Sequence, residues 1–277
     1  MFPADARVPE VRSYPLGSAE SEQERLIRQA ARLAPYTERF FRDAGLAAGQ
    51  RVLDIGSGVG DVAMLAARLV GPAGEVVGIE RDPHSIARAR ARAVGAGFHN
   101  VSFGQCDVAD LPRGEGFDAV VGRYILMFLP DPAAVLRSLA DVVRPGGVLA
   151  FQEVSWACFP VLSRHLSLWS ATGALACEVI RRSGANVEMG FELPRVFQEA
   201  GLSAPAMHME APMGNDPQFV GLICDLLGSL LPEAERLGIR ADIIGDFDTL
   251  AERLQAEVAA SRGVAVFPAL VGGWVRK

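Results

Sequence analysis

Short apolar runs alternate with longer amphipathic stretches between residues 50 and 153. The apolar runs predict five β-strands, at 51–55, 75–79, 100–103, 117–121 and 148–151. The stretches between them carry apolar residues three and four positions apart and predict helices at 61–70, 83–93 and 132–143. Strands that alternate with helices form parallel β-α-β units, so the pattern predicts a doubly wound α/β sheet. A ligand is expected beyond the carboxyl ends of the strands, next to the first one.

Helical patterns dominate the residues on either side of this sheet. They predict helices at about 21–44, 155–184, 193–200 and 216–261, the last with a break near Pro232, and strands at 206–211 and 264–267. We therefore expect an N-terminal helical cover over 1–48, a ligand-binding core over 49–154, a helical lid over 155–190, and the rest of the core over 191–277, with a helical insertion near 216–261.

Composition narrows the class of partner. Half of the 277 residues are hydrophobic and 22% are charged, which is enough apolar sequence for a sizeable buried core. The net charge of −6 argues against a nucleic-acid partner, because phosphate contacts need clustered positive charge. No signal-peptide or membrane-span pattern stands out, and the four cysteines form no CxxC pair. The sequence predicts a cytoplasmic protein. It does not exclude small neutral or cationic ligands, and it leaves a homodimer open.

The most informative stretch is the glycine loop at residues 54–61, which reads DIGSGVGD. Glycines at the end of a first strand permit a tight turn and close approach of a ligand to the backbone. The loop departs from the dinucleotide fingerprint G-x-G-x-x-G, which would need glycine in place of Asp61. It also lacks the lysine of a Walker-type phosphate loop.

Three acidic residues stand at three successive strand ends. Asp54 precedes the glycines, where its carboxylate can meet a cationic amine. Glu80 ends the second strand, where it can accept hydrogen bonds from both hydroxyls of a ribose. Asp107 follows the third strand and can accept from an exocyclic amine such as that of adenine. Together the three predict a nucleoside ligand with an amino group and without pyrophosphate.

At this point the chain resembles the Rossmann-like S-adenosylmethionine-dependent methyltransferases of class I. The resemblance spans about residues 51–153 and is carried by five segments: VLDIGSGVGD, VVGIERD, GQCDVADLP, FDAVVGRYILMFLPDP and RPGGVLAFQE. It implies a seven-stranded, mostly parallel sheet whose last strand is antiparallel. The strands at 206–211 and 264–267 would supply the last two. It also implies S-adenosylmethionine as cofactor and S-adenosylhomocysteine as product.

The same resemblance implies a role for each matching residue. Gly56 and Gly58 would line the methionine portion, and Asp54 would orient its amino group. Glu80 would hold the ribose, Asp107 with the backbone of Val108 would contact adenine, and Arg123 is placed near the methionine end. The full set of expected cofactor-binding residues is Gln29, Asp54, Gly56, Ser57, Gly58, Glu80, Arg81, Cys106, Asp107, Val108 and Arg123.

The outer segments resemble those of small-molecule methyltransferases, some of them enzymes of bacterial secondary metabolism. The resemblance rests on residues 14–17, on Glu24-Arg25-Leu26 with Gln29, and on the terminal FPALVGGWVRK. It implies a helix that closes over the cofactor and an insertion that covers the substrate. Tyr14, Met127 and Trp156 are candidate substrate contacts.

Methyl transfer is an in-line displacement that depends mainly on alignment, so a general base is needed only for a protonated nucleophile. Glu153, at the end of the fifth strand, and His165, in the lid, are the candidates. The paired Asp-Asp-Asn ligands of magnesium-dependent catechol methyltransferases are missing, and no metal is expected. The sequence does not indicate whether the accepting atom is oxygen, nitrogen or carbon.

Two other functions stay open at this stage. A nicotinamide-dependent oxidoreductase could use the same sheet, although Asp54 before the glycines and Asp61 in the fingerprint speak against it. A non-catalytic protein that binds S-adenosylmethionine could keep the same fold, although the intact glycines and the three acids disfavour it.

Overall fold

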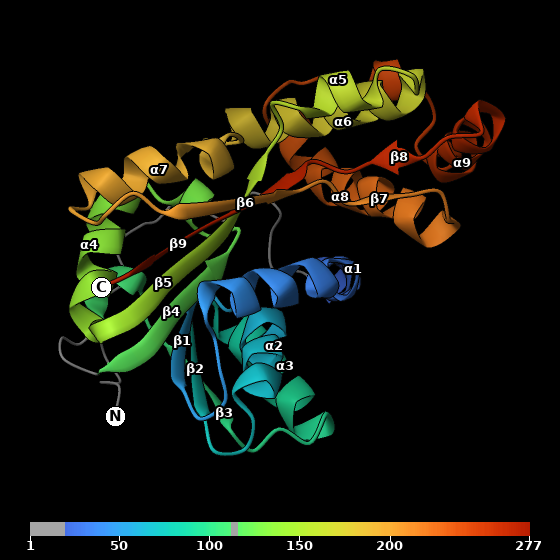
Figure 1. Cartoon of the computed structure of the whole chain (residues 1–277). Helices are drawn as coiled ribbons and strands as arrows, with labels where there is room; N and C mark the ends of the chain where they lie inside the picture. The colour runs from blue at the N-terminus through green and yellow to red at the C-terminus, as the bar shows by residue number, and fades with distance from the viewer. Residues whose placement is uncertain (1–19, 112–115) are drawn as a thin grey trace.

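A seven-stranded sheet forms the centre of the molecule in the computed structural model, which describes residues 20–111 and 116–277 (Figure 1). Its order is β3-β2-β1-β4-β5-β9-β6, in which only β9 runs antiparallel to its neighbours. The strands are β1 (Arg51–Ile55), β2 (Glu75–Glu80), β3 (Val101–Gln105), β4 (Phe117–Arg123), β5 (Val143–Ser155), β6 (Ala206–Glu210) and β9 (Ala269–Arg276). The predicted doubly wound, mostly parallel sheet is confirmed.

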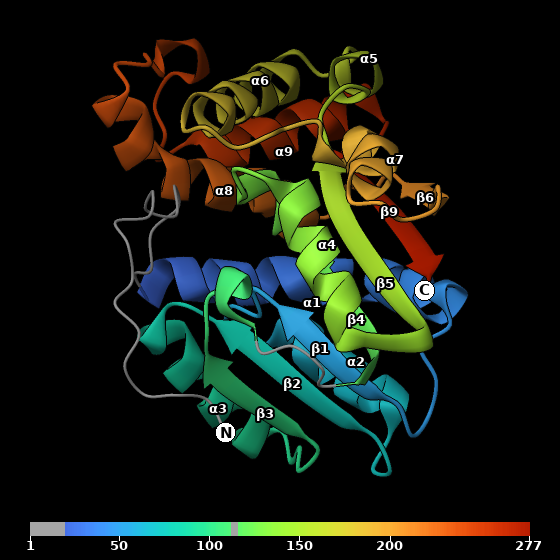
Figure 2. The ribbon, with the colours of Figure 1, turned by 90° about the vertical axis from the view of Figure 1, so that its left-hand side faces the viewer.

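The two faces of the sheet follow from the alternation of side chains along each buried strand. Val52 and Val76 lie in a cluster with α2 (Asp61–Val70) and α3 (Pro83–Gly95). Their neighbours Leu53 and Val77 point to the opposite face and join a second cluster. There they share a core with α4 (Pro132–Val142) and α7 (Met189–Glu199), and Figure 2 shows α4 lying across the strands.

Helix α1 (Glu20–Ala44) connects the sheet to the rest of the molecule. Its second half is held on the sheet by Phe40 and Phe41, both fully buried. Its first half pairs Glu24 with Arg88 of α3. Figure 2 shows α1 crossing between the strands and the upper group of helices.

That upper group lies at one end of the sheet, at the top of Figure 1, and we use the name lid for it, although it extends beyond the lid predicted over 155–190. It comprises α5 (Phe159–Ser163), α6 (Ser167–Arg182), α8 (Pro217–Arg236) and α9 (Leu250–Ser261), with a small ribbon of β7 (Met213–Gly214) and β8 (Ala265–Val266). The described residues also form three short 3-10 helices: η1 (Val108–Asp110), η2 (Leu126–Phe128) and η3 (Asp242–Ile244). Trp169 fixes the lid internally, because its ring stacks on Phe219 and its Nε1 donates to the carbonyl of Val266. No helix in the described part of the chain is both long enough and apolar enough to cross a membrane.

The prediction that residues 264–267 form the last strand of the sheet is wrong. Residues 265–266 instead form β8, which pairs with β7 outside the sheet. The seventh strand is β9, whose paired glycines concealed it because glycine is unfavourable inside a strand. Gly272 is required there, since the ring of Phe40 occupies the space that a side chain would fill.

Two predicted helical boundaries are also wrong. The break expected near Pro232 is absent, because α8 continues to Arg236. It ends before Gly238, whose φ of 66° gives the left-handed turn that commonly terminates a helix. The stretch at 155–184 is not one helix: β5 runs to Ser155, and α5 and α6 follow as separate helices.

Candidate functional site

In the glycine loop after β1, the space around the Cβ position is filled at Gly56 and empty at Gly58. Gly56 has φ +63°, and the Cδ1 atom of Ile125 lies 2.6 Å from where its Cβ would stand. Gly58 has φ +51°, and nothing lies within 4 Å of its Cβ position. A left-handed backbone of this kind favours glycine. The loop therefore packs against the segment after β4 on one side and leaves space beside Gly58.

Asp54, just before the loop, carries a buried oxygen that lacks a partner. The residue is 1% exposed, and its Oδ2 atom makes no hydrogen bond within the described residues. The hydroxyl oxygen of Ser57 is also buried and also makes no hydrogen bond within the described residues. Burial raises the pKa of Asp54 well above its ordinary value, against the opposing effect of Arg123. Buried polar atoms normally find partners, so this pair fits a bound ligand that supplies donors.

Glu80 holds the loop to the end of β2. Its carboxylate accepts hydrogen bonds from the backbone N–H groups of Gly58 (3.0 Å), Arg81 (2.7 Å) and Asp82 (3.0 Å). A carboxylate fixed in this way is oriented in advance for hydroxyl donors.

The segment after β3 lies beside Glu80. The backbone N–H of Cys106 donates to the carbonyl of Glu80, and Asp107 lies 3.8 Å from the guanidinium of Arg81. Val108 begins η1 directly afterwards. The structure thus brings these predicted cofactor residues together with the glycine loop at one edge of the sheet.

Arg123 ties the end of β4 to α1. Its Nη1 donates to the hydroxyl of Thr37 (3.0 Å), which in turn donates to Oε1 of Gln152 on β5 (2.7 Å). Arg123 is among the residues expected from the sequence, whereas Thr37 and Gln152 are not. The signal was present, because Thr37 is a polar residue on the buried face of α1 between the apolar Leu33 and Phe40.

Glu153, a candidate general base, has a structural task that the sequence did not indicate. It is fully buried, and its carboxylate accepts from the backbone N–H groups of Ile125 (3.0 Å), Leu126 (2.9 Å) and Met127 (3.4 Å). Burial raises the pKa of Glu153 from 4.5 to about 7, although these three hydrogen bonds act in the opposite direction. Glu153 is thus completely shielded from solvent and holds the start of η2, which speaks against a role as base.

His165, the other candidate base, lies away from the strand ends. It is exposed between α5 and α6, and its Nε2 is 3.1 Å from the carbonyl oxygen of Val264. This contact joins two parts of the lid, so the geometry does not support catalysis by His165.

A buried ion pair lies in the first half of α1. Glu22 and Arg25 are 2% and 3% exposed and are joined by two hydrogen bonds of 2.6 and 2.7 Å. Arg25 also donates to Oε1 of Gln29 (2.5 Å), which connects this pair to the predicted residue. The sequence singled out Gln29 without indicating that its neighbours form a buried charge pair.

The candidate substrate contacts have different positions. Met127 and Trp156 are both buried. The backbone N–H of Trp156 donates to the carbonyl of Val187, and its ring packs against Phe159. They belong to the larger core cluster that joins the sheet to the lid. Tyr14 lies outside the described residues.

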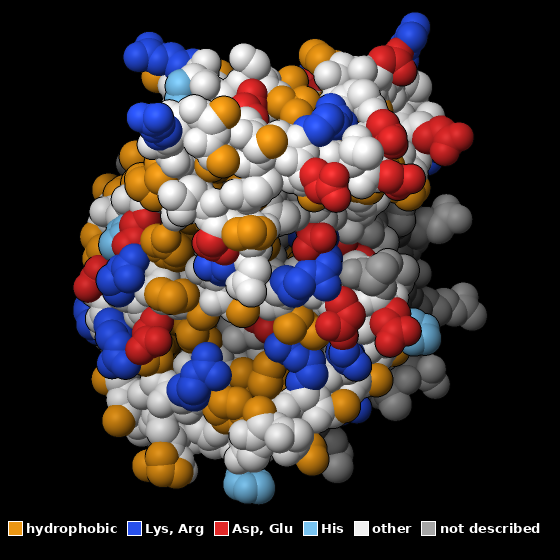
Figure 3. Space-filling model, turned by 90° about the vertical axis from the view of Figure 1, so that its right-hand side faces the viewer, with side chains coloured by type: hydrophobic (Ala, Val, Ile, Leu, Met, Phe, Trp, Pro, Cys, Tyr) orange, Lys and Arg blue, Asp and Glu red, His pale blue; other side chains and the backbone are white. Residues whose placement is uncertain are grey.

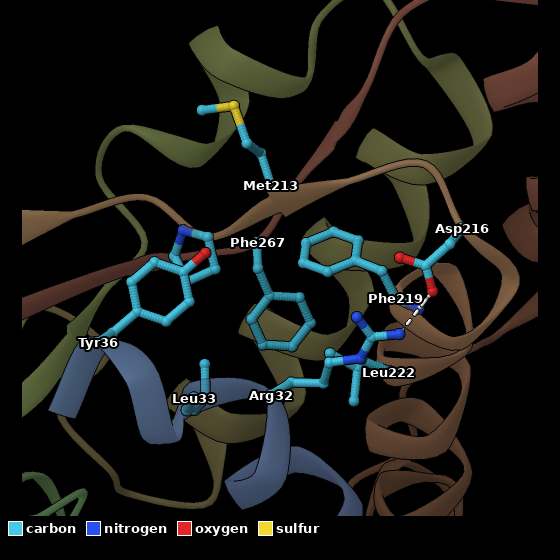
Figure 4. A pocket seen from close by; sticks show the side chains of 9 residues that line it. Arg32, Leu33, Tyr36, Met213, Asp216, Phe219, Leu222 and Phe267 are labelled. Atoms are coloured by element: carbon cyan, nitrogen blue, oxygen red, sulfur yellow. Dashed lines mark hydrogen bonds and ion pairs between the residues drawn. The ribbon is translucent and has the colours of Figure 1, made fainter. Parts of the chain in front are cut away.

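A separate cavity opens between α1 and the lid (Figure 4). An ion pair of 2.6 Å between Arg32 and Asp216 stands at its edge. It is lined by Arg32, Leu33, Tyr36, Pro212, Met213, Asp216, Phe219, Leu222 and Phe267. None of these belongs to the glycine loop or to the strand ends, so this cavity is apart from the candidate site.

No cluster of three or more His, Cys, Asp or Glu side chains suited to a metal ion occurs within 20–111 and 116–277. The expectation that the site works without a metal stays a prediction.

Comparison with known proteins gives a consistent family. A family described as a methyltransferase domain matches residues 46–201, more than half of the chain. Demethylmenaquinone methyltransferase from Staphylococcus aureus is 28% identical over 178 residues, which cover 60% of this chain and 73% of the relative.

Solved structures share the fold at lower identity. One is a chain from a Haloferax volcanii complex between a methyltransferase activator and a methyltransferase. It has a TM-score of 0.58 at 18% identity and covers 97% of this chain and 100% of that one. A structure from Bacillus halodurans, described as that of a candidate methyltransferase, has a TM-score of 0.57 at 18% identity and covers 86% and 97%. At such identities the likeness establishes the fold.

Proposed function

Since this chain belongs to the methyltransferase domain family and is an S-adenosylmethionine-dependent methyltransferase of class I, we propose that it methylates a small organic molecule. The observation that carries the proposal is the buried Oδ2 atom of Asp54, which has no partner among the described residues, at the start of a glycine loop in which the Cβ position of Gly58 is open. A buried acceptor at such a loop suits the amino group of an amino-acid cofactor.

The residues at the strand ends fit the rest of that cofactor. We propose that Asp54, Gly56, Ser57 and Gly58 hold its methionine portion, and that Glu80 receives the ribose hydroxyls. Arg81, Cys106, Asp107 and Val108 would border the adenine, while Gln29 and Arg123 would close the site from α1 and β4. When bound, the cofactor supplies an electrophilic methyl group. The protein's own contribution is to align the acceptor and to exclude water, and alignment alone can supply several kcal/mol.

Three observations support a small acceptor. The Staphylococcus aureus relative is named for demethylmenaquinone, which is a small molecule. The lid and α1 add helical cover beyond the cofactor half of the fold (Figure 1). The net charge is −6, and Figure 3 shows acidic and basic side chains interspersed over one face of the described residues, which does not favour a nucleic acid.

A place in secondary metabolism is part of the same proposal. It rests on the resemblance of the outer segments, including Glu24-Arg25-Leu26 and the terminal FPALVGGWVRK, to small-molecule enzymes.

Calorimetry and turnover test the proposal together. Wild-type protein is expected to bind S-adenosylhomocysteine in the micromolar range. With S-adenosylmethionine and a panel of phenols, quinols, amines and carboxylic acids, it should form S-adenosylhomocysteine with at least one compound. Absence of cofactor binding contradicts the assignment of the site. Cofactor binding with no turnover across the panel contradicts the small-molecule acceptor.

A further inference from the structure

Tyr124 has an unusual backbone at the end of β4. Its φ is +56°, a left-handed conformation that bulky residues rarely adopt. Its N–H donates to the carbonyl of Gln152 on β5 (3.0 Å), so the residue is still held by the sheet. Within the described chain, Arg262 is the one other non-glycine residue with positive φ, and it ends a helix.

The surroundings impose this conformation on Tyr124. Arg123, immediately before it, is tied to Thr37 of α1. Ile125, immediately after it, packs against Gly56, and its N–H is held by the carboxylate of Glu153. A strained residue persists only where its neighbours fix it, and such residues cluster at active sites and ligand clamps.

The phenol of Tyr124 has no hydrogen-bond acceptor among the described residues. The side chain is half-buried. Burial raises the pKa of Tyr124 above its ordinary value, and the carboxylate of Glu153 acts in the same direction. The guanidinium groups of Arg123 and Arg25 lower it, without overcoming burial. The phenol is therefore neutral near pH 7 and keeps its proton to donate.

Given the proposed function, we propose that Tyr124 orients the methyl acceptor by donating a hydrogen bond from its phenol to an oxygen atom of that molecule. Arg25 and Arg123, whose charges both act on the Tyr124 phenol, favour an acceptor oxygen with partial negative charge beside it. The substrate class is thus an oxygenated small molecule, such as a phenol, an enol or a carboxylic acid.

The variant Tyr124→Phe removes this hydroxyl and keeps the ring, and Tyr36→Phe is its matched control. Tyr36 lines the separate cavity, and Arg39 lies over its ring at 5.0 Å. With the best oxygenated compound of the panel, Tyr124→Phe should raise the KM of the acceptor at least tenfold with a smaller change in kcat. The melting temperature should stay at the wild-type value, and the Kd of S-adenosylhomocysteine within twofold of it. Tyr36→Phe should match wild type throughout.

Each other outcome overturns the inference. An unchanged KM in Tyr124→Phe means that the phenol does not touch the acceptor. An equal loss of cofactor affinity means that Tyr124 binds the cofactor. A lower melting temperature means that Tyr124 stabilises the fold. If only amines are methylated, the oxygenated class is wrong although the proposed function stands. If wild type neither binds the cofactor nor methylates any compound, the proposed function fails and removes the basis of this inference.

Discussion

Arg123 and Thr37, 86 residues apart in the sequence, are joined by a hydrogen bond of 3.0 Å between a guanidinium Nη1 and a hydroxyl. The same hydroxyl reaches Gln152, so one small side chain on α1 connects the ends of two central strands. This hydroxyl is one of the contacts that fix α1 over the ends of the strands, together with the buried Phe40 and Phe41.

Thr37→Val removes that atom with little change in shape. The buried amide oxygen of Gln152 then loses a donor, and we expect the free energy of unfolding to fall by about 1–3 kcal/mol. Urea unfolding measures the change. Thr172→Val is the control, because among the described residues the buried Thr172 hydroxyl bonds only to the carbonyl of Leu168 within α6. A loss in Thr37→Val no larger than in the control would contradict the connecting role.

Glu80→Ala should weaken binding of S-adenosylhomocysteine at least tenfold, or by about 1.4 kcal/mol. The change removes the proposed ribose acceptor and also frees the N–H groups of Gly58, Arg81 and Asp82. Titration calorimetry gives the affinity. Glu75→Ala at the opposite end of β2 removes an exposed carboxylate paired with Arg51 and should leave the affinity unchanged. Equal affinities in the two variants would refute the ribose assignment.

Gly56→Ala should destabilise the fold by about 2–4 kcal/mol. The left-handed backbone costs a non-glycine residue about 1–2 kcal/mol, and displacement of Ile125 adds an overpacking cost. Gly49→Ala separates the two effects, because Gly49 has φ +82° but nothing within 4 Å of its Cβ position. It should cost about 1–2 kcal/mol. Thermal unfolding of both variants measures the difference. Equal destabilisation of the two would show that Ile125 moves aside without an energetic cost.

Glu153→Gln should flatten the dependence of stability on pH. Since burial raises the pKa of Glu153 from 4.5 to about 7, the folded state holds a proton that the unfolded state releases between these values. This proton contributes about 3 kcal/mol to the free energy of unfolding below pH 4.5, and the contribution is lost as the pH rises to 7. Burial also raises the pKa of Asp54, so Asp54 stabilises the folded state at low pH in the same way. Part of the dependence of stability on pH therefore remains in Glu153→Gln.

Urea unfolding at intervals from pH 5 to pH 8 tests this expectation. Glu257→Gln is the control, because the carboxylate of Glu257 also accepts two backbone hydrogen bonds, from Leu168 and Trp169. It should keep the wild-type slope. A Glu153→Gln variant with the same slope as wild type would show that Glu153 is ionised in the folded protein throughout this range.

The cofactor half of the fold could be predicted because its signals are local. Helix α2 has the predicted bounds, and β1 ends at the glycine loop as expected. The backbone after β1 must turn sharply, and the apolar residues around it repeat with the period of each element. Asp54, Glu80 and Asp107 meet because parallel strands bring their carboxyl ends to one edge.

The rest could not be predicted because it depends on contacts between distant segments. Gly272 lowers the local preference of β9 for a strand, and the reason for it lies in Phe40 on α1. Glu153 has the position of a catalytic base, and its engagement follows from a loop 26–28 residues earlier. The tertiary structure decides these roles, and the residue type alone does not.

Strand β9 also determines when the molecule can finish folding. In the sheet, β6 pairs with β9 alone, and β9 also completes one side of β5. During synthesis the ribosome makes β6 about sixty residues before its partner, and β5 still earlier. Both therefore wait with open edges until residues 269–276 have emerged. A nascent chain that stalls in the helices of the lid leaves these edges available to chaperones or to aggregation.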